Sequence, residues 1–334
     1  MTTAESVSVS TPRRAFIAIQ QHLQKRIIGQ PELVNRLLIA LLANGHLLVE
    51  GAPGLAKTTA IKELAKVIEG DFHRLQFTPD LLPGDLTGTD VYRPETGEFV
   101  FQKGPLFHNL ILADEINRAP AKVQSALLEA MGEQQITVGK TTYPLPHPFL
   151  VMATQNPIEQ EGTYPLPEAQ LDRFLMHVVI DYPDSEHENA ILELARHQAQ
   201  QALRKKIEKA SPKTKLSNQL VQAAQQETMT IHMSEAVQTY LVQLVLASRD
   251  PSVYNQQLAQ WVSYGGSPRA TIALDHCARA HAWLAGRDYV SPDDVQAVAY
   301  DVLRHRIILS YEAEADGVTA DKVIKALIQY TPVG

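Results

Sequence analysis

Short apolar runs without polar alternation recur through the first half of the chain, and amphipathic segments separate them. The runs are His46–Glu50, Leu110–Ala113, Phe149–Ala153 and Met176–Ile180, and Phe72–Phe77, in which polar residues separate the apolar ones, is expected to be a further strand. The segments with apolar residues at helical spacing are Thr11–Ile27, Pro31–Asn44, Thr58–Ile68 and Ala121–Met131. Buried strands that alternate with helices are typical of a parallel sheet covered on both faces. The pattern therefore predicts an α/β domain.

Two other segments predict β-hairpins inserted into this domain, at residues 85–103 and 135–143. In the first, Thr89–Tyr92 and Glu98–Gln102 flank the turn sequence Arg-Pro-Glu-Thr-Gly. In the second, two short runs flank Gly139-Lys140. Short strand-like runs on either side of a glycine-containing turn are the usual sequence signal of a hairpin.

After residue 184 the pattern changes, and no convincing strand follows. Ser185 and Glu188 form a capping box, and Ser267-Pro268 and Ser291-Pro292 each place an N-cap residue before a proline at the first helical position. We therefore expect a disordered N-terminus at residues 1–11, an αβα domain at 12–184 and an all-α domain at 185–334.

Composition narrows the class of protein. The chain has 334 residues, 45% of them hydrophobic, and a net charge of −7, whereas a dedicated nucleic-acid binder usually carries a basic surplus. The one cysteine, Cys277, lies in an apolar stretch and is expected in the core. The N-terminus lacks an apolar export signal, and the longest apolar run, Leu37–Ala43, is too short to cross a bilayer. We expect a cytoplasmic protein without membrane insertion.

Residues 51–58 form a phosphate-binding loop of the pattern Gly-x4-Gly-Lys-Thr. The residues are Gly51, Ala52, Pro53, Gly54, Leu55, Ala56, Lys57 and Thr58. A strand precedes the loop and a helix follows it, so its backbone N–H groups and the helix dipole can hold anionic oxygens. Lys57 is expected to reach the β- and γ-phosphates and Thr58 to bind Mg²⁺. Ala56 replaces the usual second glycine, and we expect a negative φ there. The alternative is a helix-initiating turn with a chance lysine.

Two carboxylates follow the apolar strand Leu110–Ala113. The carboxyl end of a buried parallel strand faces the crevice where ligands bind. Asp114 is therefore expected to hold the metal ion, directly or through water, and Glu115 to orient and deprotonate the attacking water. The alternative is a pair of solvated acids after a strand.

Three more polar residues fit an ATPase that is completed by a neighbouring subunit. Asn156 ends a strand and could hold the attacking water or the γ-phosphate; alternatively it is a turn residue before Pro157. Arg173 precedes a strand and could reach a neighbour's nucleotide; alternatively it pairs with Asp172 or Glu168. Arg269 lies in the first turn of a helix, where a positive charge is unfavourable for the helix dipole, so its placement calls for another reason. A lid arginine that contacts the γ-phosphate would provide that reason. Its alternative is a surface charge.

These motifs resemble the AAA+ ATPases, and within them the MoxR family, over nearly all of residues 25–310. The specific stretches are Gly51–Thr58, Gly104–Phe107, Leu112–Ala119, Ser125–Met131 and Ala153–Phe174. The resemblance implies an αβα nucleotide domain with a parallel central sheet and a C-terminal helical lid. It also implies a homo-oligomeric ring, expected to be hexameric, with ATP and Mg²⁺ at each subunit interface.

The same resemblance assigns roles to individual residues. Lys57 and Thr58 match the Walker A motif, and Asp114 and Glu115 match Walker B. Asn156 matches sensor 1, Arg173 the arginine finger and Arg269 sensor 2, while Ile28 and Gly29 are expected to contact adenine. The two hairpins are expected to face the central channel or the top of the ring. Family members are chaperone-like and typically work with proteins that carry a von Willebrand factor A domain, so such a partner is implied here.

Three classes of function remain to be weighed: a ring ATPase that remodels a protein client, a nucleic-acid-associated motor, and a nucleotide switch without turnover. The predicted hairpins carry few cations, Arg93, Lys103 and Lys140, which argues against the motor. One basic stretch, residues 204–215, is interpreted as a solvated helix end and loop. The presence of Glu115 and Arg173 argues against the switch. No histidine pattern has metal-ligand spacing, so no metal beyond Mg²⁺ is expected.

Overall fold

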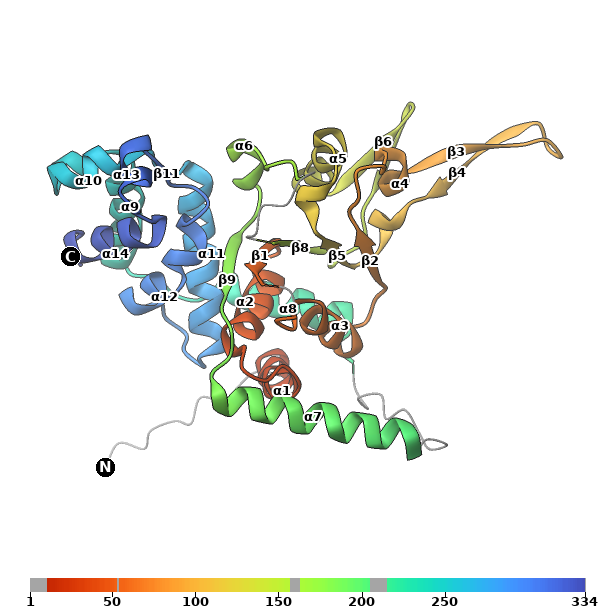
Figure 1. The fold of residues 1–334 in the computed structure, drawn as a ribbon, viewed down its shortest axis with the longest axis horizontal. Coiled ribbons are helices and arrows are strands. Elements are labelled where there is room, and N and C mark those ends of the chain that lie inside the picture. Colours follow the sequence, from red (N-terminus) through yellow and green to blue (C-terminus); the bar gives the residue numbers. More distant parts are fainter. Residues whose placement is uncertain (1–10, 53, 157–162, 205–214, 334) are drawn as a thin grey trace.

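A five-stranded parallel sheet forms the centre of the N-terminal domain, as predicted (Figure 1). The computed structural model describes residues 11–52, 54–156, 163–204 and 215–333. The strands follow the order β2-β5-β8-β1-β9. Their bounds are β1 (Leu47–Gly51), β2 (Phe72–Gln76), β5 (Leu110–Asp114), β8 (Leu150–Gln155) and β9 (Met176–Ile180). Each predicted strand is present, within two residues of its expected limits.

Side chains alternate between the two faces of the sheet, and each face supports its own hydrophobic cluster. In β1, Leu47 and Val49 belong to one cluster and Leu48 to the other, because successive strand residues point to opposite sides. Helices α1 (Thr11–Arg26), α2 (Pro31–Leu42) and α3 (Lys57–Val67) cover the first face. Helices α4 (Pro83–Thr87) and α5 (Ala121–Glu133) cover the second. Helices therefore cover both faces of the sheet, which explains why its inner strands β1, β5 and β8 lack polar alternation, whereas the edge strand β2 keeps the polar residues His73, Arg74 and Gln76.

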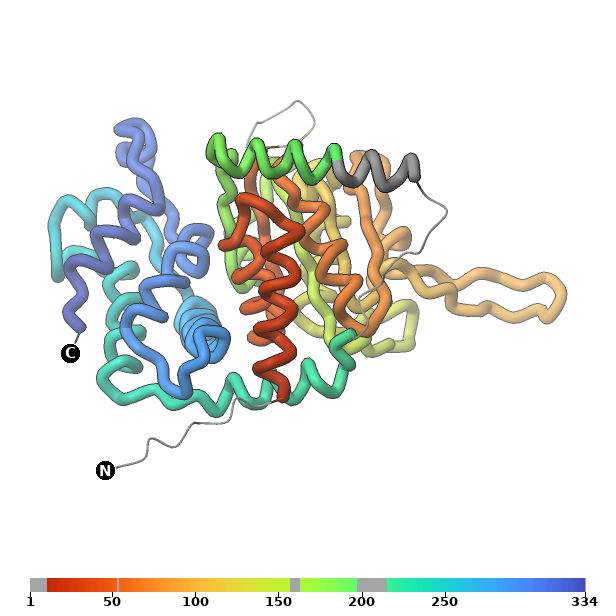
Figure 2. The backbone as a smooth tube through the Cα atoms, turned by 90° about the horizontal axis from the view of Figure 1, so that it is seen from below, coloured from red at the N-terminus to blue at the C-terminus, as the bar shows by residue number. Residues whose placement is uncertain are grey.

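Both predicted hairpins are present. One consists of β3 (Gly88–Arg93) and β4 (Glu98–Lys103), the other of β6 (Gln135–Val138) and β7 (Thr141–Pro144). The β3–β4 hairpin projects far from the body of the domain (Figures 1 and 2). Its base is held by Phe101, whose ring stacks on Tyr143 of the other hairpin at a centroid distance of 4.3 Å. Short 3₁₀ turns, η1 (Pro105–Phe107) and η2 (Ile116–Arg118), flank β5.

The region after residue 184 is helical, with one addition that the sequence did not reveal. Its helices are α7 (Ser185–Arg204), α8 (Asn218–Met229), α9 (Glu235–Arg249), α10 (Gln256–Trp261), α11 (Pro268–Leu284), α12 (Pro292–Leu303), α13 (Tyr311–Ala315) and α14 (Ala320–Tyr330), with a 3₁₀ turn η3 (Pro251–Val253). The addition is a two-stranded antiparallel sheet of β10 (Val262–Tyr264) and β11 (Ile308–Leu309). Ser267 caps α11 as predicted, by accepting a hydrogen bond from the backbone N–H of Arg269.

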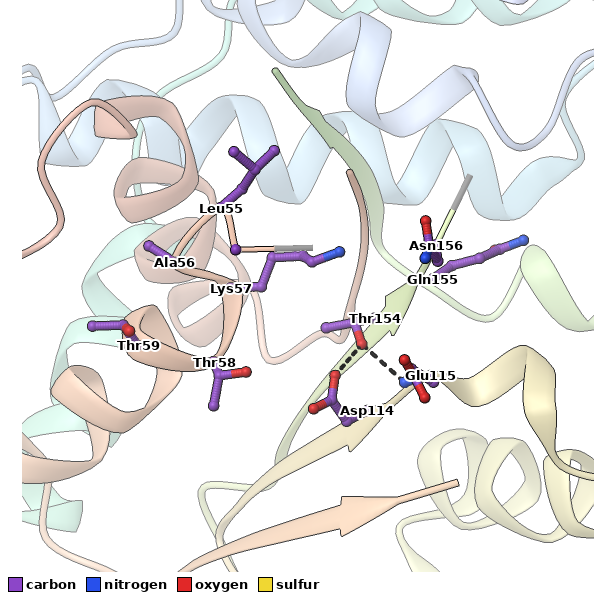
Figure 3. A pocket seen from close by; sticks show the side chains of 11 residues that line it. Leu55, Ala56, Lys57, Thr58, Thr59, Asp114, Glu115, Thr154, Gln155 and Asn156 are labelled. Atoms are coloured by element: carbon purple, nitrogen blue, oxygen red, sulfur yellow. Dashed lines mark hydrogen bonds between the residues drawn. The ribbon is translucent and has the colours of Figure 1, made fainter. Parts of the chain in front are cut away.

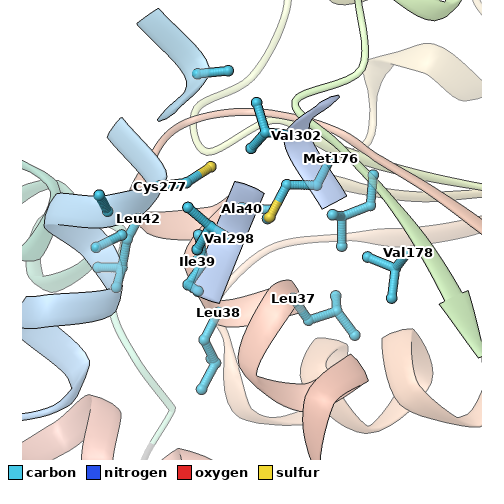
Figure 4. Packing of buried hydrophobic residues seen from close by; sticks show 14 of the residues in the cluster. Leu37, Leu38, Ile39, Ala40, Leu42, Met176, Val178, Cys277, Val298 and Val302 are labelled. Carbon is cyan, nitrogen blue, oxygen red and sulfur yellow. The ribbon is translucent and has the colours of Figure 1, made fainter. Parts of the chain in front are cut away.

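The helical region and the N-terminal domain share one continuous core. Helix α12 packs against β9, and α11 packs against α2. In Figure 4, Ile39 of α2 lies near Val298 of α12, and Cys277 of α11 belongs to the same cluster. Cys277 is completely buried, and this burial raises the pKa of its thiol to about 12, which confirms its predicted place in the core. Each fully buried leucine contributes roughly 1.5–3 kcal/mol of transfer free energy, so this contact fixes the lid beside β9.

The N-terminal limits differ slightly from the prediction. Helix α1 begins at Thr11, which was expected to belong to the disordered N-terminus, and residues 1–10 lie outside the described part of the chain. Helix α3 begins at Lys57, one residue earlier than predicted. No helix among the described residues is long and apolar enough to span a bilayer.

Candidate functional site

A polar cavity of about 290 Å³ lies at the carboxyl edge of the sheet, where β1, β5 and β8 end side by side (Figure 3). It brings together most of the predicted site: Gly54, Leu55, Ala56, Lys57, Thr58, Asp114, Glu115 and Asn156. The phosphate loop follows β1, the acid pair ends β5 and Asn156 follows β8. Because parallel strands place their carboxyl ends at one edge, segments far apart in sequence meet here. Of the predicted loop, Pro53 lies outside the described residues.

The backbone at Ala56 is left-handed, with φ of 58° and ψ of 12°, and the expected negative φ was wrong. Gly54 also has a positive φ, of 90°. A residue just before the first turn of α3 must reverse the chain so that the loop wraps around the cavity and the helix can start. A methyl group is the smallest side chain that tolerates this conformation at moderate cost, whereas a β-branched side chain would collide with the backbone.

Lys57 points into the cavity and is held by its own loop. Its Nζ donates a hydrogen bond of 2.5 Å to the carbonyl of Gly51. Burial lowers the pKa of Lys57, and the nearby carboxylates of Asp114, Glu115 and Glu50 oppose that shift. Gly51 cannot carry a side chain, because a Cβ there would lie 2.5 Å from Ile180 of β9. The loop is therefore packed tightly against the sheet, and its lysine amine is available for an anion.

The carboxylate of Asp114 is held from two sides. Its Oδ1 accepts a hydrogen bond of 2.6 Å from the hydroxyl of Thr154, and its Oδ2 accepts one of 2.6 Å from Nη2 of Arg74. Thr154 also accepts a hydrogen bond of 2.9 Å from the backbone N–H of Glu115 (Figure 3). One threonine of β8 thus fixes both members of the acid pair.

Glu115 sits on a left-handed backbone, with φ of 57°, directly after β5. Its Oε2 accepts a hydrogen bond of 2.7 Å from the amide of Gln76 and lies 3.1 Å from Nε of Arg118. The turn at Glu115 directs its carboxylate along the cavity wall rather than along the strand. A carboxylate so placed, beside a phosphate loop, is suited to accept a proton from water.

The residues that line this cavity could hold phosphate groups and a magnesium ion. The N-terminus of α3 supplies backbone N–H groups, and Lys57 supplies a positive charge for phosphate oxygens. Thr58 and Asp114 line the same cavity and offer hydroxyl and carboxylate oxygens, which are the ligands that Mg²⁺ prefers. Among the described residues, no group of three or more His, Cys, Asp or Glu side chains forms another metal site.

A second cavity of about 300 Å³ adjoins the first and shares Gly54, Leu55 and Ala56 with it. Ile28, Pro183 and apolar residues of α7, including Ile191 and Leu194, line it. The backbone of Gly29 approaches Pro183 so closely that a Cβ there would lie 3.0 Å from the proline ring. This mostly apolar slot lies next to the phosphate loop and could hold a flat base, and Ile28, which was expected to contact adenine, lines it.

Arg173 and Arg269 do not line either of these cavities. They lie together in a third cavity, of about 390 Å³, which Asp172 and Arg306 also line. Nη1 of Arg173 donates a hydrogen bond of 2.6 Å to the carbonyl of Leu128 in α5. Among the described residues, Arg173 makes no ion pair, so it does not pair with Asp172 or Glu168 as the alternative proposed. Arg269, however, lies 3.8 Å from a carboxylate oxygen of Asp172.

This third cavity lies at the opposite edge of the sheet. Arg173 precedes β9, and Gly45 and His46, which precede β1, line the same cavity. The phosphate loop follows β1, which pairs in parallel with β9. A strand of five residues spans about 16 Å. Both arginines are therefore on the far side of the sheet from the phosphate loop of the same chain.

Sequence reasoning gave no site role to four residues that shape the site, Arg74, Gln76, Thr154 and Asp172, although Asp172 was named as an alternative partner of Arg173. Thr154 lies at the end of β8, two residues before Asn156, and this closeness in the chain was the available sequence signal. Arg74 and Gln76 occupy alternate positions of β2, on one side of the strand that pairs with β5. Nothing in the sequence of β2 indicates which strand it pairs with, so their contacts with the acid pair could not be inferred.

Comparison with known proteins identifies the two parts of the chain. A family model described as "ATPase family associated with various cellular activities (AAA)" matches residues 46–176. A model described as "AAA lid domain" matches residues 258–327.

Similar proteins cover almost the whole chain. "Chaperone MoxR1" of Mycobacterium tuberculosis is 45% identical over 325 residues, which are 97% of this chain and 82% of that protein. "Protein MoxR" of Paracoccus denitrificans is 34% identical over 295 residues, 85% of this chain and 86% of that protein. A crystal structure of a Cytophaga hutchinsonii protein described as an ATPase is 47% identical, with a TM-score of 0.87, and covers 97% of this chain and 96% of that one.

Proposed function

The chain belongs to the MoxR family of AAA+ ATPases, and from this premise we propose that it hydrolyses ATP with Mg²⁺ in a ring-shaped homo-oligomer. The observation that carries the proposal is the division of the site. The groups that bind and attack the nucleotide share one cavity, and two arginines lie together at the other edge of the sheet. A subunit divided in this way needs a neighbour to complete its site.

Within one subunit, the proposed roles follow from position and charge. Lys57 and the loop N–H groups bind the phosphates, and Thr58 and Asp114 hold the metal ion. When bound, Mg²⁺ supplies positive charge that stabilises the developing negative charge on the phosphate oxygens. Glu115 takes a proton from the attacking water, and Asn156 orients that water or the γ-phosphate. Ile28 and Gly29 contact the base.

Arg173 and Arg269 are proposed to act on the nucleotide of the adjacent subunit. Arg269 was predicted to read the γ-phosphate as a lid residue, and its position beside Arg173 supports a reading across the interface rather than within the subunit. The guanidinium groups then stabilise charge that develops during cleavage. Hydrolysis in this arrangement depends on assembly, and a hexamer is the proposed number of subunits.

For the use of this hydrolysis we propose chaperone-like remodelling of a protein client, with a partner that carries a von Willebrand factor A domain. The "Chaperone" in the name of the Mycobacterium tuberculosis relative supports the first part. The projecting β3–β4 hairpin exposes Tyr92 and Phe99, the latter to 70%, as surface for an apolar segment of a client. The alternative, a nucleic-acid motor, is disfavoured because Asp90, Glu95 and Glu98 outnumber the cations of that hairpin.

The proposal is tested with three single variants and their mixtures. Lys57→Ala is expected to abolish ATP binding, because the phosphate charge is left unmatched. Glu115→Gln is expected to bind ATP but to lose turnover by about 100-fold or more. Arg173→Ala is expected to bind ATP and to be inactive alone, with a loss of about 10³-fold or more, yet to regain activity when mixed with Lys57→Ala subunits.

Lys66→Ala is the matched control for the loop variant, since Lys66 lies on the same helix and pairs with Glu63 outside the cavity. It is expected to bind ATP normally. Normal ATP affinity in Lys57→Ala would contradict the proposed division of the site. The same conclusion would follow if Lys57→Ala subunits restored no activity to Arg173→Ala. Stimulation of turnover by DNA at low salt would favour the motor instead.

A further inference from the structure

We propose that Asp172 is a positioning residue, which holds Arg173 and Arg269 at fixed places so that both reach the neighbouring nucleotide together. The inference rests on the proposed action of these arginines across the subunit interface. It explains how Arg173 of the N-terminal domain and Arg269 of the lid act as one unit.

Both oxygens of the Asp172 carboxylate are used by the lid. Oδ1 accepts a hydrogen bond of 2.7 Å from Nε of Arg306, which follows α12. Oδ2 accepts one of 2.9 Å from the hydroxyl of Ser267 and lies 3.8 Å from Nη1 of Arg269. Asp172 is adjacent to Arg173 in sequence, so its contacts to the lid determine where the backbone of Arg173 lies.

Ser267 links Asp172 directly to the turn that carries Arg269. Its hydroxyl oxygen accepts a hydrogen bond of 3.1 Å from the backbone N–H of Arg269 while its proton is donated to Asp172. One hydroxyl thus caps α11 and ties the cap to the core. The first turn of α11 cannot shift without breaking one of these two bonds, so the position of Arg269 is set by Asp172.

Arg306 fixes the rest of the segment between Asp172 and β9. Its side chain is only 3% exposed, and its guanidinium also donates to the carbonyls of Asp172, Phe174 and Leu175, at 3.2, 2.6 and 3.2 Å. The two residues before it follow the same pattern: His305 contacts the carbonyl of Phe174 and Arg304 that of His177. A buried guanidinium needs matched acceptors on every side, which makes this geometry hard to vary.

Arg173 itself is held on the opposite side, by α5. Its Nη1 donates to the carbonyl of Leu128, and a Cβ at Gly132 would lie 3.0 Å from the same nitrogen. The guanidinium therefore rests against α5 while its backbone is fixed by the lid. A displacement of the Asp172 segment would shift the arginine relative to the helix, and small misplacements of a catalytic group cost large factors in rate.

The test compares Asp172→Asn with the unchanged protein, first alone and then in assemblies mixed with Lys57→Ala subunits. Asparagine keeps the shape and one acceptor but loses the charge that matches Arg306. We expect kcat per subunit to fall about 10- to 100-fold, with ATP affinity and assembly unchanged, because the nucleotide cavity is at the other edge of the sheet. When Asp172→Asn subunits are mixed with an excess of Lys57→Ala subunits, whose arginines are intact, their activity should be restored.

Asp275→Asn is the matched control, since Asp275 forms an ion pair with Arg279 within α11 and does not itself line the third cavity. It should leave kcat unchanged. Ser267→Ala provides a second route if Asp172→Asn folds poorly, because it removes the link to α11 but leaves the Arg306 pair. It should lower kcat and be restored by the same mixing.

The outcomes separate this inference from the proposed function. The positioning role alone is overturned if kcat is unchanged in Asp172→Asn and Ser267→Ala. In that case Lys57→Ala subunits would still restore the ATPase activity of Arg173→Ala. A fall in kcat that mixing does not restore, accompanied by lost assembly or ATP affinity, also overturns it and leaves Asp172 a purely structural anchor. Failure to restore Arg173→Ala would instead contradict the action across the interface on which the inference rests.

Discussion

At the scale of single residues, the phosphate loop depends on one methyl group in an unfavourable conformation. Ala56 adopts φ of 58° immediately before α3, at the position where other phosphate loops usually carry glycine. A left-handed backbone costs an L-residue roughly 1–2 kcal/mol relative to the right-handed region. The remaining contacts of the loop, including the hydrogen bond from Lys57 to Gly51, must offset that cost.

Ala56→Gly is therefore expected to stabilise the protein by up to about 1 kcal/mol, because glycine adopts a positive φ without strain. The free energy of unfolding, measured with denaturant, tests this. Ala60→Gly is the control: Ala60 lies buried within α3, and glycine there is expected to destabilise the helix by about 1 kcal/mol or more. Equal destabilisation by both substitutions would contradict the left-handed conformation at Ala56.

The identity of the residues at the acid pair could be predicted, but their surroundings could not. Asp114 and Glu115 follow an apolar strand, and that local order was enough to assign them to the cavity. Their partners Arg74 and Gln76 belong to β2, which is about 40 residues away in the chain. A hydrogen bond between strands depends on which strands are neighbours, and no local pattern contains that information.

At the scale of elements, the first turn of α12 depends on one buried carboxylate. Asp294 is completely buried and accepts hydrogen bonds from the backbone N–H and hydroxyl of Ser291, at 2.8 and 2.9 Å. Arg287 and His281 also contact it. Burial alone would raise the pKa of Asp294, but the hydrogen bonds from Arg287, His281 and Ser291 outweigh burial and hold its pKa well below the ordinary value.

A carboxylate with a depressed folded-state pKa stabilises the fold at neutral pH. The contribution is complete above the unfolded-state pKa of 3.8 and is lost as the pH falls below it towards the lower folded-state value. Asp294→Asn is therefore expected to lower the free energy of unfolding by about 3 kcal/mol at neutral pH, since it leaves Arg287 poorly matched. The difference from the unchanged protein should shrink in acid.

Thermal unfolding of both proteins over a pH series measures this effect. Asp293→Asn is the control, because Asp293 lies in the same first turn but, among the described residues, forms no hydrogen bond or ion pair with Arg287, His281 or Ser291. A difference between Asp294→Asn and the unchanged protein that is constant with pH would contradict the assignment of this stability to the ionised carboxylate.

Most elements could be predicted because their signals are local. The caps at Ser267 and Ser291, the glycine turns of both hairpins and the apolar strands each occupy a few consecutive residues. The β10–β11 sheet was missed because its strands are three and two residues long and lie more than 40 residues apart. So short a strand has no recognisable alternation, and its existence depends on tertiary packing.

At the scale of the whole molecule, the division of the site predicts that activity depends on protein concentration. Each subunit contains the phosphate loop, the acid pair and the adjoining apolar slot, so a monomer should still bind ATP. Its own Arg173 and Arg269 lie at the other edge of the sheet, so hydrolysis per subunit should rise steeply with concentration as subunits assemble. ATPase activity and light scattering over a dilution series measure the two together.

Arg173→Ala provides the reference for this experiment, because its low activity should not change with concentration while its assembly does. Binding of a fluorescent ATP analogue should be nearly constant over the same series. Full hydrolytic activity at dilutions where light scattering reports only monomers would contradict the proposed ring.

The sequence by itself determined the periodicity, caps and turns of most elements and the phosphate loop with its acid pair, because each depends on residues close together in the chain. Tertiary structure decided the left-handed turn at Ala56, the partners of Asp114 and Glu115, and the placement of Arg269 beside Arg173. These features depend on strand order and on the contact of the lid with β9, through which residues as distant as Asp172 and Arg306 meet. Such contacts form only when the whole chain packs, so they leave no periodic signal in the sequence.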